Sequence, residues 1–181
     1  MAYVEKTLQE WIAENPDYNT YAGTAAGVPL VYQTAAGAPD LEASKWKVWD
    51  WVSELPDTNQ APAEADISTT GKTARSLLPI VPDAPAASEL EINLGADTDA
   101  AIDALEALVE AYQGALKAGE TFYLAHFLGE GKKSQIYAAA VSWSGGINGT
   151  FPDPLTTTIA ITPDLGKYNK HQAITVTVVG G

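Results

Sequence analysis

Two stretches of the chain repeat apolar residues at the spacing of an amphipathic helix. The longer one, Asp97–Ala118, starts with residues that can cap a helix and is followed by Gly119, a common helix stop. Its apolar stripe is formed by Ile102, Leu105, Leu108, Val109, Tyr112 and Leu116. The shorter one, Tyr3–Glu14, ends at Asn15-Pro16, because the residue before a proline avoids helical geometry. The pattern predicts one core helix and one short N-terminal helix.

The remaining apolar residues mostly follow strand patterns. Ser88–Leu94 alternates strictly, with Leu90, Ile92 and Leu94 on one face. Gly129-Glu130-Gly131 predicts a hairpin turn between the strands on either side of it. The other expected strands are Val28–Thr34, Trp46–Leu55, Glu64–Thr70, Thr121–Leu128, Ser134–Trp143, Leu155–Thr162 and Gln172–Val179. About eight strands and one core helix predict a mainly-β fold, an antiparallel β-sandwich or barrel with the helix packed against it.

Three tryptophans fall within six residues of one expected strand. Trp46 belongs to one face of this strand, whereas Trp49 and Trp51 belong to the other. Both faces of the strand must therefore be at least partly covered. We interpret the three side chains as core or inter-subunit residues. The alternative is an exposed aromatic platform that stacks on sugars.

A long segment in the middle of the chain has no helix or strand pattern. Gly71–Ala87 holds three prolines and is interpreted as a loop. Loops longer than about 12–15 residues are mostly functional or disordered. This one carries an apolar group formed by Leu77, Leu78, Ile80 and Val81. An apolar group on such a loop indicates a surface that binds a partner.

The charged residues are few and unevenly divided. They make up 18% of the chain, with 23 acidic and 10 basic residues and a net charge of −13. The excess lies in the first 120 residues, whereas residues 121–181 hold three acidic and four basic side chains. This balance opposes nucleic-acid recognition, which needs clusters of Lys and Arg, and docking on an anionic membrane. No stretch approaches the roughly 18 apolar residues of a membrane span.

The motifs do not predict an enzyme. The absence of cysteine excludes disulfides, thiolate ligands and cysteine nucleophiles. Gly71-Lys72-Thr73 has the ending of a phosphate-binding loop, but Asp66 stands where that pattern needs its first glycine. His126 lies on the apolar face of an expected strand and is interpreted as a core or interface residue, with a small hydrolase as the remaining enzymatic alternative. We expect no catalytic residue, no cofactor and no metal site.

The order of the segments, rather than any single motif, resembles that of a known protein family. The first half of the succession is PLVYQTAAGAPD, Lys45–Leu55, Ile67–Arg75, a proline-rich loop that closes at Pro82-Asp83, and LEINL. The second half is the helix Asp99–Ala118 with Gly119-Glu120, then Phe122–Ala125, Tyr137–Ser142, a Ser-Gly-Gly turn and Leu155–Thr162. Over Val28–Pro163 this succession resembles the tail tube protein, or major tail protein, of long-tailed, non-contractile bacteriophages. The tubes of contractile tails and of type VI secretion systems share the family's fold and remain alternatives. A β-sandwich carbohydrate- or receptor-binding module is the alternative from another class.

The resemblance implies a β-sandwich with one flanking helix that assembles into hexameric rings. The rings would stack into a hollow tube in the phage tail of the virion, after assembly in the cytoplasm of the host bacterium. DNA would pass through the lumen without specific binding, which suits an acidic chain. Further partners would be the tape measure, tail tip and terminator proteins.

The resemblance also implies a division of the chain. Residues 28–181 would form the tail-tube domain, whereas residues 1–27 depart from the simplest members of the family and are expected to form an arm or a short helix that packs on another subunit. The loop 62–87 would contact the adjacent ring through Arg75, Leu77, Leu78, Ile80 and Val81.

Overall fold

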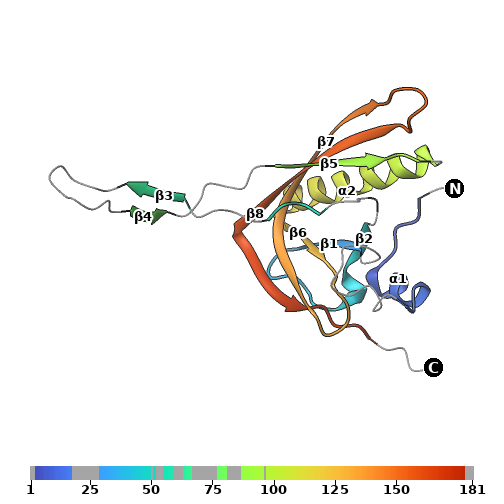
Figure 1. Cartoon of the computed structure of the whole chain (residues 1–181). Coiled ribbons are helices and arrows are strands. Elements are labelled where there is room, and N and C mark those ends of the chain that lie inside the picture. The colour runs from blue at the N-terminus through green and yellow to red at the C-terminus, as the bar shows by residue number, and fades with distance from the viewer. Residues whose placement is uncertain are drawn as a thin grey trace.

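The main element of the structure, a computed structural model, is an open antiparallel sheet of six strands in the order β2-β1-β6-β7-β8-β5 (Figure 1). The structure describes residues 3–17, 29–49, 51, 55–58, 63–66, 77–80, 87–95 and 97–177. Its strands are β1 (Leu30–Ala35), β2 (Lys47–Trp49), β3 (Ala63–Asp66), β4 (Leu77–Ile80), β5 (Ser88–Asn93), β6 (Thr121–His126), β7 (Lys133–Asn148) and β8 (Thr156–Ala173), and its helices are α1 (Leu8–Glu14) and α2 (Thr98–Ala118). The mainly-β, antiparallel prediction is confirmed. The sheet does not close into a barrel, because β2 and β5 stand at its two ends.

Helix α2 covers one face of the sheet and follows the prediction from the sequence (Figure 1). The Asp97 carboxylate accepts a hydrogen bond from the Ala100 amide, and the helix ends at Gly119, whose φ of 71° is left-handed. Its buried side is richer in alanine than the predicted stripe, since Ala100, Ala101, Ala104 and Ala115 are buried beside Leu105 and Leu108. Leu116, which was expected in the stripe, is 59% exposed. Small side chains let the helix lie close to the sheet.

The central strands are buried on both faces. On the α2 side, Leu30 and Tyr32 of β1 pack with Leu124 of β6. On the opposite side, Val31 and Tyr123 pack around Leu8 and Trp46. Neighbouring residues of one strand thus enter different cores, as the period of two in a strand requires. The sequences of these strands are therefore continuous apolar runs and do not alternate between apolar and polar residues.

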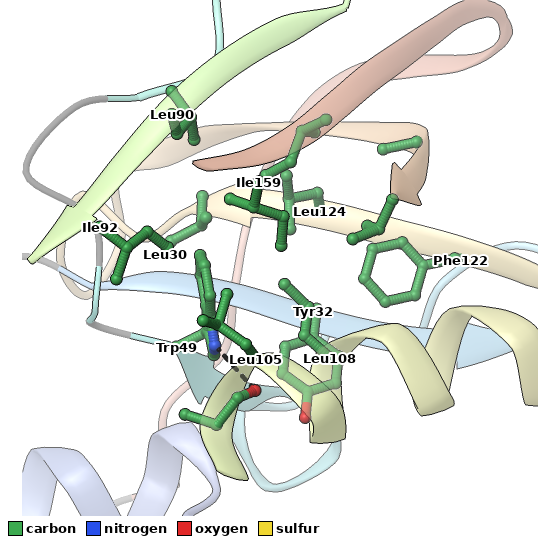
Figure 2. Packing of buried hydrophobic residues seen from close by; sticks show 14 of the residues in the cluster. Leu30, Tyr32, Trp49, Leu90, Ile92, Leu105, Leu108, Phe122, Leu124 and Ile159 are labelled. Carbon is green, nitrogen blue, oxygen red and sulfur yellow. Dashed lines mark hydrogen bonds between the residues drawn. The ribbon is translucent and has the colours of Figure 1, made fainter. Parts of the chain in front are cut away.

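The tryptophans divide between the two cores, as their alternation predicts. Trp46 is fully buried in the core on the α1 side, and Trp49 is fully buried in the core on the α2 side, where Trp51 packs at the margin. Figure 2 shows Trp49 among the leucines of the core on the α2 side. Its Nε1 donates a hydrogen bond to the Ala104 carbonyl at 3.2 Å. The Trp46 indole donates to the Asp40 carbonyl at 2.8 Å. Both buried indole N–H groups are satisfied.

Several boundaries differ from the prediction. Leu155–Thr162 and Gln172–Val179 were expected as two strands, but β8 runs from Thr156 to Ala173 and pairs with β7 on both sides of a register shift. The register shifts between Tyr137↔Asn169 and Ala138↔Asp164, so residues 165–168 form a bulge. A local pattern cannot distinguish a bulge from a loop, because the partner strand decides between them.

The expected strand Trp46–Leu55 is described only in part, because residues 50 and 52–54 lie outside the described residues. Among those described, Lys47–Trp49 pairs with β1, and Trp46 closes a 3-10 turn over Ala43–Lys45. Helix α1 begins at Leu8 rather than at Tyr3. Thr7 caps it, because the Thr7 hydroxyl accepts from the Glu10 amide while the Glu10 carboxylate accepts from the Thr7 amide. Neither described helix is both long and apolar enough to cross a membrane.

A matched pair of substitutions tests the packing of α2. Leu105→Ala should lower the free energy of unfolding by about 2–5 kcal/mol, because it leaves a cavity in a fully buried site. Leu116→Ala on the same helix should change it by less than about 0.5 kcal/mol, because the side chain is exposed. Urea denaturation followed by circular dichroism measures both. Equal losses in the two variants would contradict the packing described here.

Candidate functional site: the sheet edges and the long hairpin

The segment expected as a long loop contains a β-hairpin. β3 and β4 pair antiparallel from Ala63↔Ile80 to Asp66↔Leu77 and form a separate two-stranded sheet. In Figure 1 this hairpin stands apart from the six-stranded sheet. The loop prediction for Gly71–Ala87 was therefore wrong for the part that forms β4.

The residues expected to make the contact between rings fall on and around β4. Leu77, Leu78 and Ile80 belong to this strand. Arg75 and Val81 lie outside the described residues.

The root of this hairpin is tied to the sheet by a chain of hydrogen bonds. The Asp57 amide donates to the Ser88 hydroxyl at 2.9 Å, which joins the residues that lead into and out of the excursion. The Thr58 hydroxyl donates to Gln135 Oε1 at 2.8 Å, and Gln135 Nε2 donates to Asn169 Oδ1 at 3.1 Å. The hairpin thus departs from a defined point on β5, β7 and β8.

The N-terminal segment covers the edge of the sheet at β2. The Leu8 amide donates to the Trp46 carbonyl at 2.7 Å, and the Val48 amide donates to the Lys6 carbonyl at 2.9 Å. The Leu8 side chain is fully buried. The first half of the predicted arm therefore lies on its own chain, and residues 18–28, which include its remainder, lie outside the described residues.

Glu5 fastens the same segment electrostatically. Its carboxylate accepts hydrogen bonds from the Tyr32 hydroxyl at 2.7 Å and from the Lys47 ammonium at 2.9 Å. Burial alone would raise the pKa of the Glu5 carboxyl, but the bonds from Lys47 and Tyr32 together outweigh it and lower the pKa. Burial and the nearby Glu5 carboxylate raise the pKa of Tyr32. Glu5 is therefore charged at neutral pH and links the N-terminal segment to β1 and β2.

The opposite edge of the sheet, at β5, has no strand on its outer side among the described residues. Leu90 and Ile92 point into the core, whereas Glu89 and Glu91 are exposed. Charged side chains on an edge strand discourage indiscriminate pairing. Among the described residues, one edge of the sheet is thus covered, and the other is protected by charge but open to a complementary strand.

His126 lies in a small pocket of about 180 Å³ beneath the hairpin root. The described residues that line it are Leu30, Leu55, Pro56, Thr58, His126, Leu128, Gln135 and Tyr137, and none of these is a carboxylate or a serine. The Thr58 hydroxyl donates to the Gln135 amide oxygen, and an amide cannot serve as a general base. The hydroxyl of Thr58 is therefore bonded to a group that would not activate it as a nucleophile.

The described part of the chain also contains no group of three or more His, Cys, Asp or Glu residues placed to hold a metal ion. Of the three tryptophans considered as a sugar platform, Trp46 and Trp49 are fully buried, and Trp51 is partly buried. An exposed row of three aromatic rings is therefore not formed.

Sequence reasoning overlooked three features of these surfaces. The first is the bond between Asp57 and Ser88, which joins residues far apart in the sequence and leaves no local signal. The second is the capping box of Thr7 and Glu10. Their spacing of three residues is visible in the sequence and would have predicted that the helix begins at Leu8. The third is the apolar end of the β7–β8 hairpin, which lies where the sequence indicated only a Ser-Gly-Gly turn before the strand Leu155–Thr162.

In comparisons with models of known protein families and with curated proteins, the chain matches none of them.

The hairpin root can be tested through its first hydrogen bond. Ser88→Ala removes the acceptor of the Asp57 amide, so this amide should exchange with solvent about fivefold faster, as expected for the loss of a bond worth ~1 kcal/mol. Ser142→Ala, at an exposed position of β7, should leave the exchange unchanged. Hydrogen exchange followed by NMR measures both. Unaltered exchange in the Ser88 variant would refute the clamp.

The Glu5 contacts predict a pH-dependent stability. Glu5→Gln should lower the free energy of unfolding at pH 7 by about 1 kcal/mol or less, because the pair is partly exposed. The folded-state pKa lies below the ordinary value of 4.5, so the contribution is present above that pH and is lost as the pH falls through the lowered pKa. Urea titrations at pH 7 and pH 3 should show the difference shrinking. Glu91→Gln on β5 is the control, and an equal Glu5 effect at both pH values would contradict the prediction.

Proposed function

We propose that this chain is a structural subunit of a bacteriophage tail tube, assembling into hexameric rings that stack into a hollow conduit for DNA. The observation that carries the proposal is the anchored β3–β4 hairpin, which stands apart from a helix-flanked antiparallel sheet with an open edge. The order of sequence segments that resembles the tail tube family supports the same assignment. A subunit of this kind needs surfaces that are completed only by its neighbours.

The hairpin supports the stacking role. A segment of this length that leaves the sheet at one clamped point and returns to it is built to reach beyond its own subunit. The residues Leu77, Leu78 and Ile80 on β4 are apolar in sequence and have a ladder partner only in β3. Contact with the adjacent ring would bury them. Such a contact joins different surfaces of two copies, which is the condition for an open stack.

The open sheet supports the ring. The outer edge of β5 can accept a strand from a neighbouring subunit, while the edge at β2 is already covered by residues of its own N-terminal segment. The sandwich or barrel expected from the sequence would then be completed between subunits rather than within one. The fold of this proposal also occurs in contractile-tail and type VI secretion tubes, which stay as alternatives.

The charge distribution suits a conduit for DNA. Helix α2 exposes an acidic stripe along its outer side, formed by Asp99, Asp103, Glu106 and Glu110. Four lysines lie instead at the start of β7 and in the second half of β8, namely Lys132, Lys133, Lys167 and Lys170. A chain with a net charge of −13 repels phosphate and would let a duplex slide past without binding. The proposed location is the virion tail, where the tape measure, tail tip and terminator proteins are further partners.

Electron microscopy of the purified protein tests the proposal directly. The wild-type chain should form rings or tubes at high concentration. Leu78→Asp combined with Ile80→Asp should give a folded protein whose tubes are shortened at least tenfold, because two charges would enter the contact between rings. Leu116→Asp, at an exposed position of α2, is the matched control and should leave tube length within twofold.

Two results would overturn the proposal or its stacking role. A wild-type chain that stays monomeric at high concentration, even beside a tail-tip complex that initiates assembly, would overturn the tail-tube function. Tubes of normal length from the doubly substituted chain would overturn the role of the hairpin.

A further inference from the structure

The outer edge of β8 is paired along only half of its length. β5 lies beside Thr156–Ile161, whereas no strand among the described residues lies beside Thr162–Ala173 on that side. In Figure 1 the second half of β8 turns away from β5. We call the stretch Thr162–Ala173 the β8 half-edge. A strand has backbone N–H and C=O groups on both sides, so another strand can be added here.

The β8 half-edge is basic on a chain that is acidic as a whole. Lys167, Lys170 and His171 are exposed on it, and neither lysine forms an ion pair with a carboxylate of the described residues. Asp164 is the one acidic residue within the half-edge, and its carboxylate accepts a hydrogen bond from the Lys167 amide at 3.2 Å. Lysines on an open edge deter indiscriminate pairing, so this edge favours an acidic strand.

The charges that flank the half-edge leave this preference unchanged. Lys133 of β7 pairs with Ala173 at its end. Glu42 lies just beyond, where it bridges to Thr175. One basic and one acidic residue thus flank the end of the half-edge, and the residues within it decide its charge.

Lys170 is held in position by aromatic side chains. Its ammonium nitrogen lies 5.4 Å from the centroid of the Tyr168 ring, within the range of a cation–π contact. The Tyr168 hydroxyl donates to Gln172 Oε1 at 2.9 Å, and its ring packs edge-on against Tyr123 with the centroids 5.1 Å apart. The ammonium group is therefore already ordered before a partner binds, which lowers the entropy lost on binding.

A second open edge belongs to β3. Glu64 of β3 lies opposite Pro79 of β4. Proline has no N–H to give to the ladder, and in sheets its nitrogen faces the open side of an edge strand. Because hydrogen-bonded and non-bonded pairs alternate in an antiparallel ladder, the backbone groups of Glu64 and Asp66 face the outer side of β3. The outer edge of β3 thus keeps its donors, whereas that of β4 lacks one.

We infer that β3 of one copy pairs along the β8 half-edge of a second copy. This contact rests on the proposed stacking of rings, and it names the surface that receives the hairpin. The sequence of β3 is Ala-Glu-Ala-Asp, so Glu64 and Asp66 fall on one face of the strand. They would approach the ammonium groups of Lys167 and Lys170. Backbone hydrogen bonds join the two strands, and the opposite charges select the partner.

The occupant is a second copy because the two edges belong to different parts of one chain. The strands β3 and β4 form a sheet of their own, and in Figure 1 this hairpin stands apart from the six-stranded sheet. A contact between the hairpin of one copy and the half-edge of another is head-to-tail, so it can repeat along a stack. Two chains of net charge −13 repel each other, and an acidic strand on a basic edge is an approach that attraction favours.

Charge reversal with rescue tests the contact in the full-length chain. Lys167→Glu with Lys170→Glu should reduce the sedimenting assembly at least tenfold, because like charges would then face each other. Glu64→Lys with Asp66→Lys should reduce it as much. All four substitutions in one chain restore opposite charges and should return the assembly to within threefold of the wild type. Circular dichroism checks that each variant is folded.

A matched control separates pairing from net charge. Lys167→Glu and Lys170→Glu are combined with Glu106→Lys and Glu110→Lys, at exposed positions of α2. This chain has the same net charge as the rescued one but leaves β3 acidic, so its assembly should stay at least tenfold reduced. Assembly that survives reversal of either edge, or that the α2 substitutions restore equally well, would overturn the inference.

Cysteine crosslinking provides a second measurement, because the natural chain has no cysteine. Glu64→Cys and Lys170→Cys are combined in one full-length chain, which is treated at high concentration with a short bis-maleimide. A denaturing gel should show a ladder of dimers and longer species, at least tenfold stronger than that of Glu106→Cys with Lys170→Cys. A ladder no stronger than this control would show that the half-edge has no preference for β3 and would overturn the inference.

The inference and the proposed function can fail separately. Tubes from the wild type and from both reversed chains, without the ladder, would remove this contact and leave the tail-tube function standing. A ladder from a chain that forms no ring or tube in the microscope would support the contact and remove the tail-tube function. A wild-type chain that stays monomeric, together with a cysteine variant that gives no ladder, would overturn both.

Discussion

Burial of the central strands on both faces is the constraint on which the rest of the structure depends. β1 and β6 send alternate apolar side chains to opposite sides, so each side must be covered by another element. Helix α2 covers one side. Helix α1 covers the other side together with Ile174 and Val176, which follow β8. The indole of Trp49 donates to the backbone of α2, and the Leu8 amide of α1 donates to the Trp46 carbonyl, so each layer is held by both packing and hydrogen bonding.

The same arrangement explains why the two edges of the sheet differ. The segment that brings α1 to its face also runs along β2, and Glu5 fastens it to Lys47 and Tyr32. No comparable segment among the described residues reaches β5, where Glu89 and Glu91 discourage unspecific pairing. The hairpin root at Ser88 and the projecting end of β8 both adjoin this strand. The hairpin root and the open edge proposed for assembly therefore lie on the same side of the sheet.

Much of the candidate site could not be read from the sequence, for identifiable reasons. The hydrogen bond from Asp57 to Ser88 spans the whole hairpin, and such a contact leaves no periodic signal. The stretch around Phe151 is rich in Gly, Pro and Asn, so its composition indicates a turn whatever its one aromatic side chain does. The apolar group at Leu77, Leu78 and Ile80 was visible, but its place in a paired strand depends on β3.

The sequence by itself determined the local elements whose signals lie within one turn or one alternation. Helix α2 with its stop at Gly119, the strict alternation of β5, and the assignment of Trp46 and Trp49 to opposite faces all follow from spacing. Only the tertiary structure decided that β8 is one bulged strand, that α1 lies on its own chain and that the sheet stays open. The reason is that pairing and edge coverage join residues distant in the chain. Their free energy depends on partners that no local pattern contains.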